Sequence, residues 1–232
     1  MDEAPPIGEP GLTTTVWTVG HATRPIAEFL DVLRAHGIST LVDVRAIPAS
    51  RRNPQFGRDA LARAAEGAAL RYVWMGDSLG GLRRPRPDSP HAALRVEGFR
   101  GYADHMTTPA FREGLDALLA LAREGSTAAM CAETVWWRCH RSILADHLTL
   151  VRDVRVFHIL DAGPAKPHES RPEARLDGDV LVYDRRVSRD EGTRGGGAPA
   201  SREAPGLFAD APPAEREAGA DARPRATERP AG

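Results

Sequence analysis

Residues 128–142 read Ala128-Ala129-Met130-Cys131-Ala132-Glu133-Thr134-Val135-Trp136-Trp137-Arg138-Cys139-His140-Arg141-Ser142. The apolar run at the start of this stretch predicts a buried strand, and the amphipathic residues after it predict a helix. The loop between them holds both cysteines of the chain, together with a carboxylate, a histidine, two arginines and two tryptophans. Since α/β folds place their sites where strands give way to helices, we expect the functional site here.

The composition limits the class of protein. The chain has 232 residues and a formal net charge of −1, so it has no global basic field of the kind that favours nucleic acid. Two cysteines are too few for a secreted disulfide scaffold, and we expect a reducing cytoplasm. No apolar run approaches the roughly 20 residues needed to cross a bilayer, so no membrane association is expected.

Strand and helix patterns alternate along the chain. Strands are predicted at 16–20, 40–44, 71–75, 128–131 and 154–160, with a weak one at 180–183. Helices are predicted at 25–36, 59–66, 109–124 and after 142. The connection at 76–107 is predicted to be a long irregular segment. This alternation is typical of an α/β fold with an open, mainly parallel sheet that is covered by helices on both faces.

The chain ends differ from this pattern. Residues 1–14 are acidic and rich in Pro and Gly, and we expect a flexible leader. Residues 15–184 are predicted to form the α/β domain. From 185 to 232 large apolar side chains are almost absent, so burial cannot offset the entropy of ordering, and we expect a disordered tail.

The carboxyl ends of parallel strands lie at one edge of a sheet, where ligands bind. We therefore expect that edge to gather residues following three strands: His21 and Arg24, Asp43 and Arg45, and Cys131 and Glu133. Each has two interpretations. His21 is either a general base or a residue that shapes its turn. The arginines either pair with protein carboxylates such as Asp43 and Glu133 or clamp a substrate phosphate.

The cysteines carry the reactive chemistry. Cys139 precedes His140 at a predicted helix start, where a thiolate is favoured, so it is a candidate nucleophile or redox group. Cys131 ends a buried strand and is either a second thiol of the site or inert packing. Together with Glu133 and His21, these residues offer the sulfur, nitrogen and oxygen donors that zinc prefers. The two cysteines, however, are eight positions apart in the sequence, whereas those of a usual zinc knuckle are two to four positions apart. We therefore assign no metal, and the sequence names no cofactor.

Five separated motifs follow one another along the chain: Gly20-His21-Ala22-Thr23-Arg24, Val42-Asp43-Val44-Arg45-x-x-Pro48-x-Ser50-Arg51, Leu79-Gly80-Gly81, Phe99-x-Gly101-Tyr102-Ala103, and Cys131-Ala132-Glu133 leading to Cys139-His140-Arg141-Ser142. In this order they resemble the DUF488 family, a domain of unknown function. The resemblance implies a Rossmann-like, three-layer α/β domain from about Val16 to Tyr183 in a bacterial cytoplasmic protein. Residues 134–137 depart from the family, which usually has a Pro-containing stretch there.

A weaker likeness is to rhodanese-type sulfurtransferases, whose second strand also ends in Asp-Val-Arg. Cys131 would be the positional equivalent of their cysteine. The loop after Cys131 is bulky and acidic, unlike a loop built to cradle an anion, so this likeness remains an analogy.

The leading hypothesis is an enzyme, a hydrolase or transferase, that acts on a phosphate-bearing small molecule or nucleotide-type substrate. The alternatives are a nucleic-acid-associated module using the arginines at 51–52 and 83–86, and a thiol redox or metal-binding protein. The predicted catalytic residues are Cys139, Glu133, His21, Asp43 and Cys131. The predicted substrate-binding residues are Arg24, Arg45, Arg51, Arg100, Arg141, His140 and Tyr102.

Overall fold

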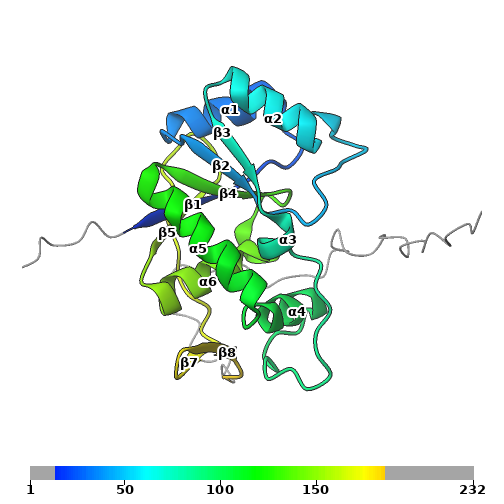
Figure 1. The fold of residues 1–232 in the computed structure, drawn as a ribbon, viewed down its shortest axis with the longest axis vertical. Helices are drawn as coiled ribbons and strands as arrows, with labels where there is room; N and C mark the ends of the chain where they lie inside the picture. The colour runs from blue at the N-terminus through cyan, green and yellow to red at the C-terminus, as the bar shows by residue number, and fades with distance from the viewer. Residues whose placement is uncertain (1–13, 186–232) are drawn as a thin grey trace, which may run out of the picture. The chain divides into compact units, whose positions relative to one another are not determined.

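The computed structural model describes residues 14–185, and its fold is α/β (Figure 1). The predicted leader and tail lie outside the described residues, apart from the residues next to the domain. In the described part no helix combines the length and the apolar character needed to cross a membrane.

A six-stranded sheet forms the centre of the fold. Its order is β3-β2-β4-β1-β5-β6, with β1 to β5 parallel and β6 antiparallel to β5. The strands are β1 Thr15–Gly20, β2 Thr40–Asp43, β3 Arg71–Trp74, β4 Thr127–Cys131, β5 Arg155–Ile159 and β6 Lys166–Pro167. Two further strands, β7 Ala174–Asp177 and β8 Val180–Tyr183, pair with each other in a separate antiparallel sheet.

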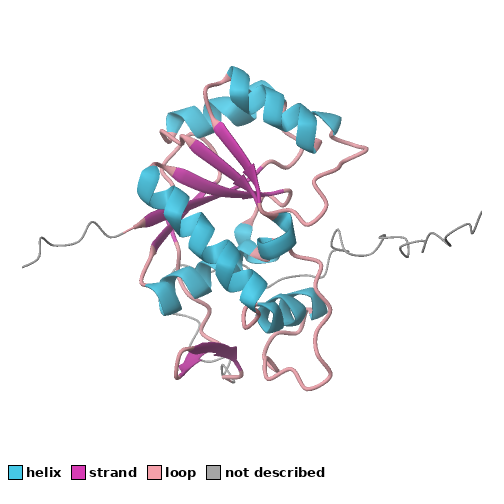
Figure 2. Ribbon diagram, viewed as in Figure 1, coloured by secondary structure: helices cyan, strands magenta, loops and turns pink. Residues whose placement is uncertain are grey.

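Helices cover both faces of the sheet (Figure 2). One face carries α1 Ile26–Ala35 and α2 Arg58–Gly67, and the other carries α5 Pro109–Glu124 and α6 Arg141–Arg152. Two shorter helices, α3 Gly76–Leu79 and α4 Glu97–His105, pack beside α5 and α6. Two 3-10 turns, η1 Pro54–Phe56 and η2 Trp136–Arg138, lie in the loops after β2 and β4.

Alternate side chains of the strands feed two separate cores. Leu41 and Met130 pack with Phe29 and Leu33 under α1 and α2. Val42, Ala129 and Val16 point to the other face and pack against buried residues of α5 and α6. Because both faces are covered, β2 is buried along its whole length and β4 is buried up to Met130, rather than alternating between buried and exposed residues. Burying each leucine contributes about 1.5–3 kcal/mol.

Two expectations differ from the structure. The segment predicted to be irregular contains α3 and α4. The buried residues Phe99, Tyr102 and Ala103 of α4, with Met106 at its C-cap, have helical spacing. The helix was missed because two glycines within it lower its intrinsic propensity. The strand predicted at 180–183 exists, but it belongs to the two-stranded sheet and not to the central one.

The connections leaving β1 and β4 diverge at the middle of the sheet. The chain leaves β1 for α1 on one face, while it leaves the adjacent β4 for α6 on the other. Such a divergence is a topological switch point, and open α/β sheets bind ligands in the crevice beyond it. The loop that contains both cysteines begins at this point.

Candidate functional site

The loop after β4 lies against the end of β1. The backbone N–H of His21 donates to the carbonyl of Cys131 over 3.0 Å, and that of Ala22 donates to Ala132 over 2.9 Å. A Cβ atom on Gly20 would lie only 2.0 Å from the carbonyl oxygen of Glu133, so no other residue fits there. The glycine thus allows the contact that brings His21 beside the cysteine loop.

A buried ion pair lies at the end of β2. Arg45 donates from Nε and Nη2 to the two carboxylate oxygens of Asp43, over 2.8 and 2.5 Å. The Tyr72 hydroxyl donates to the same carboxylate over 2.8 Å. Burial alone would lower the pKa of Arg45, but the hydrogen bonds and charge of Asp43 outweigh it and the pKa is raised. Of the two partners proposed for Arg45, the structure contains the protein carboxylate.

His21 completes this arrangement. Its Nδ1 donates to the carbonyl of Ala22 over 2.8 Å, so Nε2 accepts from Arg45 Nη1 over 3.1 Å. Its ring stacks on Phe56 with the centroids 4.0 Å apart. Burial lowers the pKa of His21 to about 4, and the positive charge of Arg45 acts in the same direction. His21 is therefore neutral near pH 7, and the lone pair that a general base would use is already engaged.

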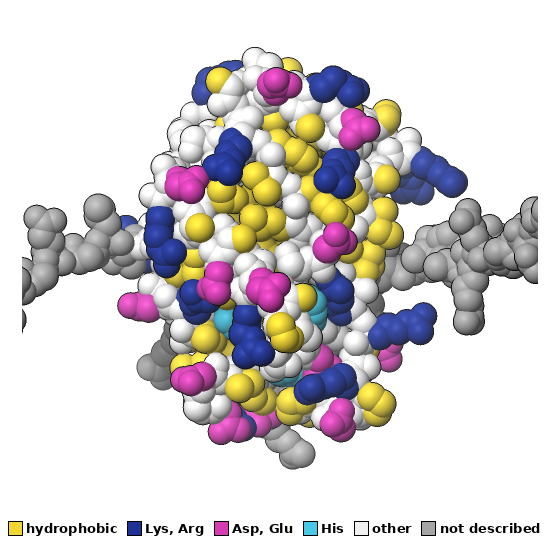
Figure 3. Space-filling model, in the orientation of Figure 1, with side chains coloured by type: hydrophobic (Ala, Val, Ile, Leu, Met, Phe, Trp, Pro, Cys, Tyr) yellow, Lys and Arg dark blue, Asp and Glu magenta, His cyan; other side chains and the backbone are white. Residues whose placement is uncertain are grey.

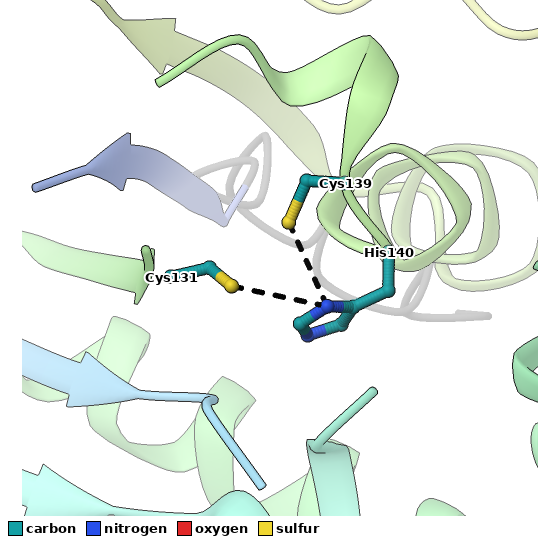
Figure 4. Close-up of side chains that lie close together, drawn as sticks. All are labelled: Cys131, Cys139 and His140. Atoms are coloured by element: carbon teal, nitrogen blue, oxygen red, sulfur yellow. Dashed lines mark hydrogen bonds between the residues drawn. The ribbon is translucent and has the colours of Figure 1, made fainter. Parts of the chain in front are cut away.

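Both thiols face one imidazole nitrogen (Figure 4). Nδ1 of His140 lies 3.6 Å from the Cys139 sulfur and 4.0 Å from the Cys131 sulfur. The three atoms lie within 4.8 Å of one another, and both cysteines are free. Cys139 and His140 are buried, whereas Cys131 is partly exposed. We call Cys131, Cys139 and His140 the sulfur–histidine cluster.

Arg141 supplies a positive charge to this cluster. Its side chain is only 1% exposed, and Nε donates to the Cys139 sulfur over 3.4 Å. Nη2 donates to the backbone carbonyls of Glu133 and Thr134, which fixes the start of the loop. The described residues offer the guanidinium no carboxylate. The Cys139 sulfur is therefore the side-chain acceptor that faces its charge.

The protonation of the two thiols is coupled. Burial would raise the pKa of Cys139, but a hydrogen bond from Cys131 and the charges of His140 and Arg141 outweigh it, so the pKa is lowered. The pKa of Cys131 is raised by its hydrogen bond to Cys139 and by burial. Of the two thiols, Cys139 is therefore the one that loses its proton more readily.

Residues from a distant connection hold the imidazole in place. The ring of Tyr102 lies 4.9 Å from that of His140, and the Tyr102 hydroxyl donates to the carbonyl of Leu79 over 3.1 Å. A Cβ atom on Gly81 would lie 2.9 Å from Nδ1 of His140. Nε2 of His140 has no hydrogen-bond partner within residues 14–185, so packing sets the ring orientation.

The family model described as "Domain of unknown function DUF488" matches residues 25–148, more than half of the chain. The chain belongs to the DUF488 family. The predicted membership of this family is thereby confirmed over residues 25–148, and the family description names no activity. No curated protein matches the chain. No solved structure matches it either.

Not every predicted site residue of this DUF488 domain reaches the cluster. Arg24 donates to the carbonyls of Gly20 and Leu160 and thereby joins the ends of β1 and β5. Arg100 was placed in a loop, but it lies on α4, 3.9 Å from the carboxylate of Glu97.

Two other predicted site residues, Arg51 and Glu133, have side chains without a hydrogen-bond or ion-pair partner among the described residues. Arg51 is exposed and has no side-chain partner among residues 14–185. The Glu133 carboxylate makes no hydrogen bond or ion pair among residues 14–185, and only the backbone of Glu133 takes part in the site, in contacts with Arg141 and Cys131. Two shallow hollows of about 280 and 150 Å³ lie beside α1 and α2 and are lined by none of the cluster residues.

The sequence interpretation missed a buried polar chain beside the loop. The His158 ring is hydrogen-bonded to the Thr18 hydroxyl over 2.7 Å and to the His168 ring over 3.0 Å. His168 in turn is hydrogen-bonded to the Asp146 carboxylate over 2.9 Å. The His158 ring stacks on Trp136 at 4.2 Å. Polar side chains within two apolar strands were the available signal. The stack identifies Trp136 as a loop anchor in this structure.

Proposed function

We propose that this DUF488 domain is an enzyme that acts on an anionic, phosphate-bearing small molecule, with the sulfur–histidine cluster as its reaction centre. The observation that carries the proposal is the convergence of both thiols on Nδ1 of His140, at the switch point of the sheet. Reactive groups gathered from separate elements at such a point are typical of an active site.

The surroundings of the cluster support an anionic substrate. Arg138 in η2 and Arg51 after β2 are exposed, and neither side chain has an ion-pair or hydrogen-bond partner among the described residues. Their guanidinium groups are free to bind phosphate in a fork geometry. The buried Arg45 and Arg141 have a different role, because Asp43, His21 and the loop already use their donors. Recognition is therefore assigned to the exposed pair.

Exposed apolar side chains support a substrate with an apolar portion. Ile47, Leu82 and Trp137 are among the most exposed large apolar residues of the described part. Leu82 directly follows Gly81, which lies against His140, and Ile47 directly follows Ala46, which lies against Gly80. Trp137 lies in η2, between the two cysteines. Leu82 has a φ of +61°, a left-handed conformation that costs of order 1–3 kcal/mol and that clusters at functional sites.

The nucleic-acid alternative has less support. On the face drawn in Figure 3, acidic and basic side chains are intermixed, and the net charge of the chain is −1. A protein that binds nucleic acid mainly through the phosphate backbone relies on lysines and arginines concentrated on one surface. The observations therefore favour a small anion over a polyanion.

Calorimetric titration with a panel of nucleotides and sugar phosphates tests the proposal. Arg138→Ala is expected to weaken binding of the best compound by about tenfold or more, as loss of one charge-assisted hydrogen bond does. Arg123→Ala is the matched control, because Arg123 is equally exposed but lies at the end of α5, before β4 begins. Equal affinities of the two variants, or no binding by the wild-type protein, would contradict the proposal.

A further inference from the structure

The sulfur–histidine cluster has the donor set of a metal site. Within residues 14–185, no other group of three or more Cys, His, Asp or Glu side chains comes together closely enough to hold an ion. Its ligand atoms are two sulfurs and one imidazole nitrogen. We propose that Cys131, Cys139 and His140 bind a Zn²⁺ ion.

The distances fit tetrahedral coordination. Zn–S bonds of about 2.3 Å and Zn–N bonds of about 2.0–2.1 Å place ligand sulfur and nitrogen atoms about 3.6 Å apart, and two sulfurs about 3.8 Å apart. The observed S···Nδ1 distances are 3.6 Å for Cys139 and 4.0 Å for Cys131. The two sulfurs are no more than 4.8 Å apart. Binding therefore requires only small shifts of the Cys131 side chain.

The chemistry of the donors selects the metal. Thiolate and imidazole are soft or borderline ligands, which suit zinc and not Mg²⁺ or Ca²⁺, both of which prefer oxygen. Two thiolates also neutralise the charge of a divalent ion in a buried place. Arg141 donates to the Cys139 sulfur over 3.4 Å and would serve as an outer-shell hydrogen bond to that ligand.

Three protein ligands leave one coordination position open. The Glu133 carboxylate does not belong to the group. His21 does not belong to it either, because its two ring nitrogens face Ala22 and Arg45. Catalytic zinc sites characteristically have three protein ligands and an open fourth position, whereas structural sites have four ligands. Cys131 is the partly exposed residue of the three, whereas Cys139 and His140 are buried. An ion with an open position polarises a bound oxygen of a substrate or lowers the pKa of a bound water.

This inference rests on the proposed function only in placing the reaction centre at these three side chains. The site itself is argued from donor type and geometry. A metal measurement therefore succeeds or fails independently of whether a phosphate-bearing compound binds.

The test is equilibrium dialysis of the full chain against Zn²⁺ in reducing buffer, followed by elemental analysis. The wild-type protein is expected to retain about one Zn²⁺ per chain. The Cys131→Ser and His140→Gln variants each lose a metal ligand. Loss of an outer-shell partner typically lowers metal affinity by roughly 10–100-fold, and we expect each of these variants to lose more Zn²⁺ affinity than that. His147→Gln is the matched control, since His147 is buried on the same helix but outside the cluster, and it should bind like wild type.

Two outcomes would overturn the site. One is wild-type protein with no zinc above the level of the dialysis buffer, and the other is stoichiometric zinc that persists when Cys131→Ser and His140→Gln are combined. Circular dichroism melts identify a variant that fails to fold. In that case the partly exposed Cys131→Ser, which changes one atom, decides the question.

Discussion

Gly81 and His140 are in close contact: a Cβ atom on Gly81 would lie 2.9 Å from Nδ1 of the histidine. The contact joins the Leu79-Gly80-Gly81 motif to the sulfur–histidine cluster, although 59 positions separate the two residues in the sequence. An imidazole whose Nε2 has no described hydrogen bond depends on such packing for its orientation.

Gly81→Ala should therefore impair the cluster without unfolding the domain. The added methyl group would clash with the imidazole and requires the ring to move from its present position, and we expect Zn²⁺ affinity to fall by about tenfold or more. Gly67→Ala is the control, because a Cβ atom there meets nothing within 4 Å. Both variants are to be compared by zinc dialysis and thermal melting. Equal zinc affinities would show that the contact does not position His140.

Arg45→Ala should destabilise the domain. Removing the guanidinium leaves the fully buried Asp43 carboxylate without its partner, which typically costs about 3–5 kcal/mol. Arg71→Ala removes an exposed ion pair with Glu124 and should cost at most about 1 kcal/mol. Urea unfolding of both variants checks the difference. A loss of less than 1 kcal/mol for Arg45→Ala would contradict the structural role of the pair.

Stability should fall as the pH drops from about 6.5 to about 4. His21 and His147 have folded-state pKa values of about 4, lowered mainly by burial, against about 6.5 in the unfolded chain. The unfolded state therefore binds more protons in this interval, and the stabilisation present above pH 6.5 is lost on acidification. Each histidine accounts for on the order of 3 kcal/mol.

His21→Gln checks this assignment. His158, His91 and His105 also have pKa values lowered mainly by burial, so they contribute in the same direction. Because the variant lacks one of these groups, its unfolding free energy should change less between pH 7 and pH 5 than that of the wild-type protein. Denaturant titrations at the two pH values provide the measurement. An identical pH dependence would show that His21 is not the titrating group.

Trp136→Ala should loosen the cysteine loop. The stack on His158 is the described ring contact between this loop and β5, and its loss removes an anchor from residues 132–138. We expect faster amide hydrogen exchange in the loop while α5, whose contacts are unchanged, retains its protection. Unaltered exchange in the loop would show that the stack does not anchor it.

Glu133→Gln separates chemistry from folding. The carboxylate makes no described contact, so the free energy of unfolding should change by less than about 0.5 kcal/mol. If Glu133 transfers protons in the reaction, as the sequence hypothesis holds, turnover of the best phosphate-bearing compound should fall by about 10²–10⁴-fold. Unchanged turnover would remove it from the catalytic residues, and Glu28→Gln provides an exposed control.

Periodicity and strand order explain what the sequence could predict. The apolar strands ending at Gly20, Asp43 and Cys131 are strongly patterned, so the rule for parallel sheets correctly placed His21, Arg45 and the cysteines at one edge. The pairing of Arg45 with Asp43 was one of two stated options. The connection at 76–107 was harder, because glycines conceal the helical pattern of α4.

Contacts between distant segments explain what the sequence could not predict. Spacing along the chain argued against a metal, since eight positions separate Cys131 from Cys139. The fold brings them together because the loop turns through η2 and returns to β4. Similarly, nothing local to His158 indicates that it stacks on Trp136 or faces His168.

The convergence of two thiols and one imidazole is tested most directly by X-ray absorption spectroscopy of the Zn²⁺-loaded protein at the zinc edge. The structure predicts a first shell with two sulfurs at about 2.3 Å and one nitrogen at about 2.0–2.1 Å, completed by a light atom. A shell of nitrogen and oxygen alone, or one with a single sulfur, would contradict it.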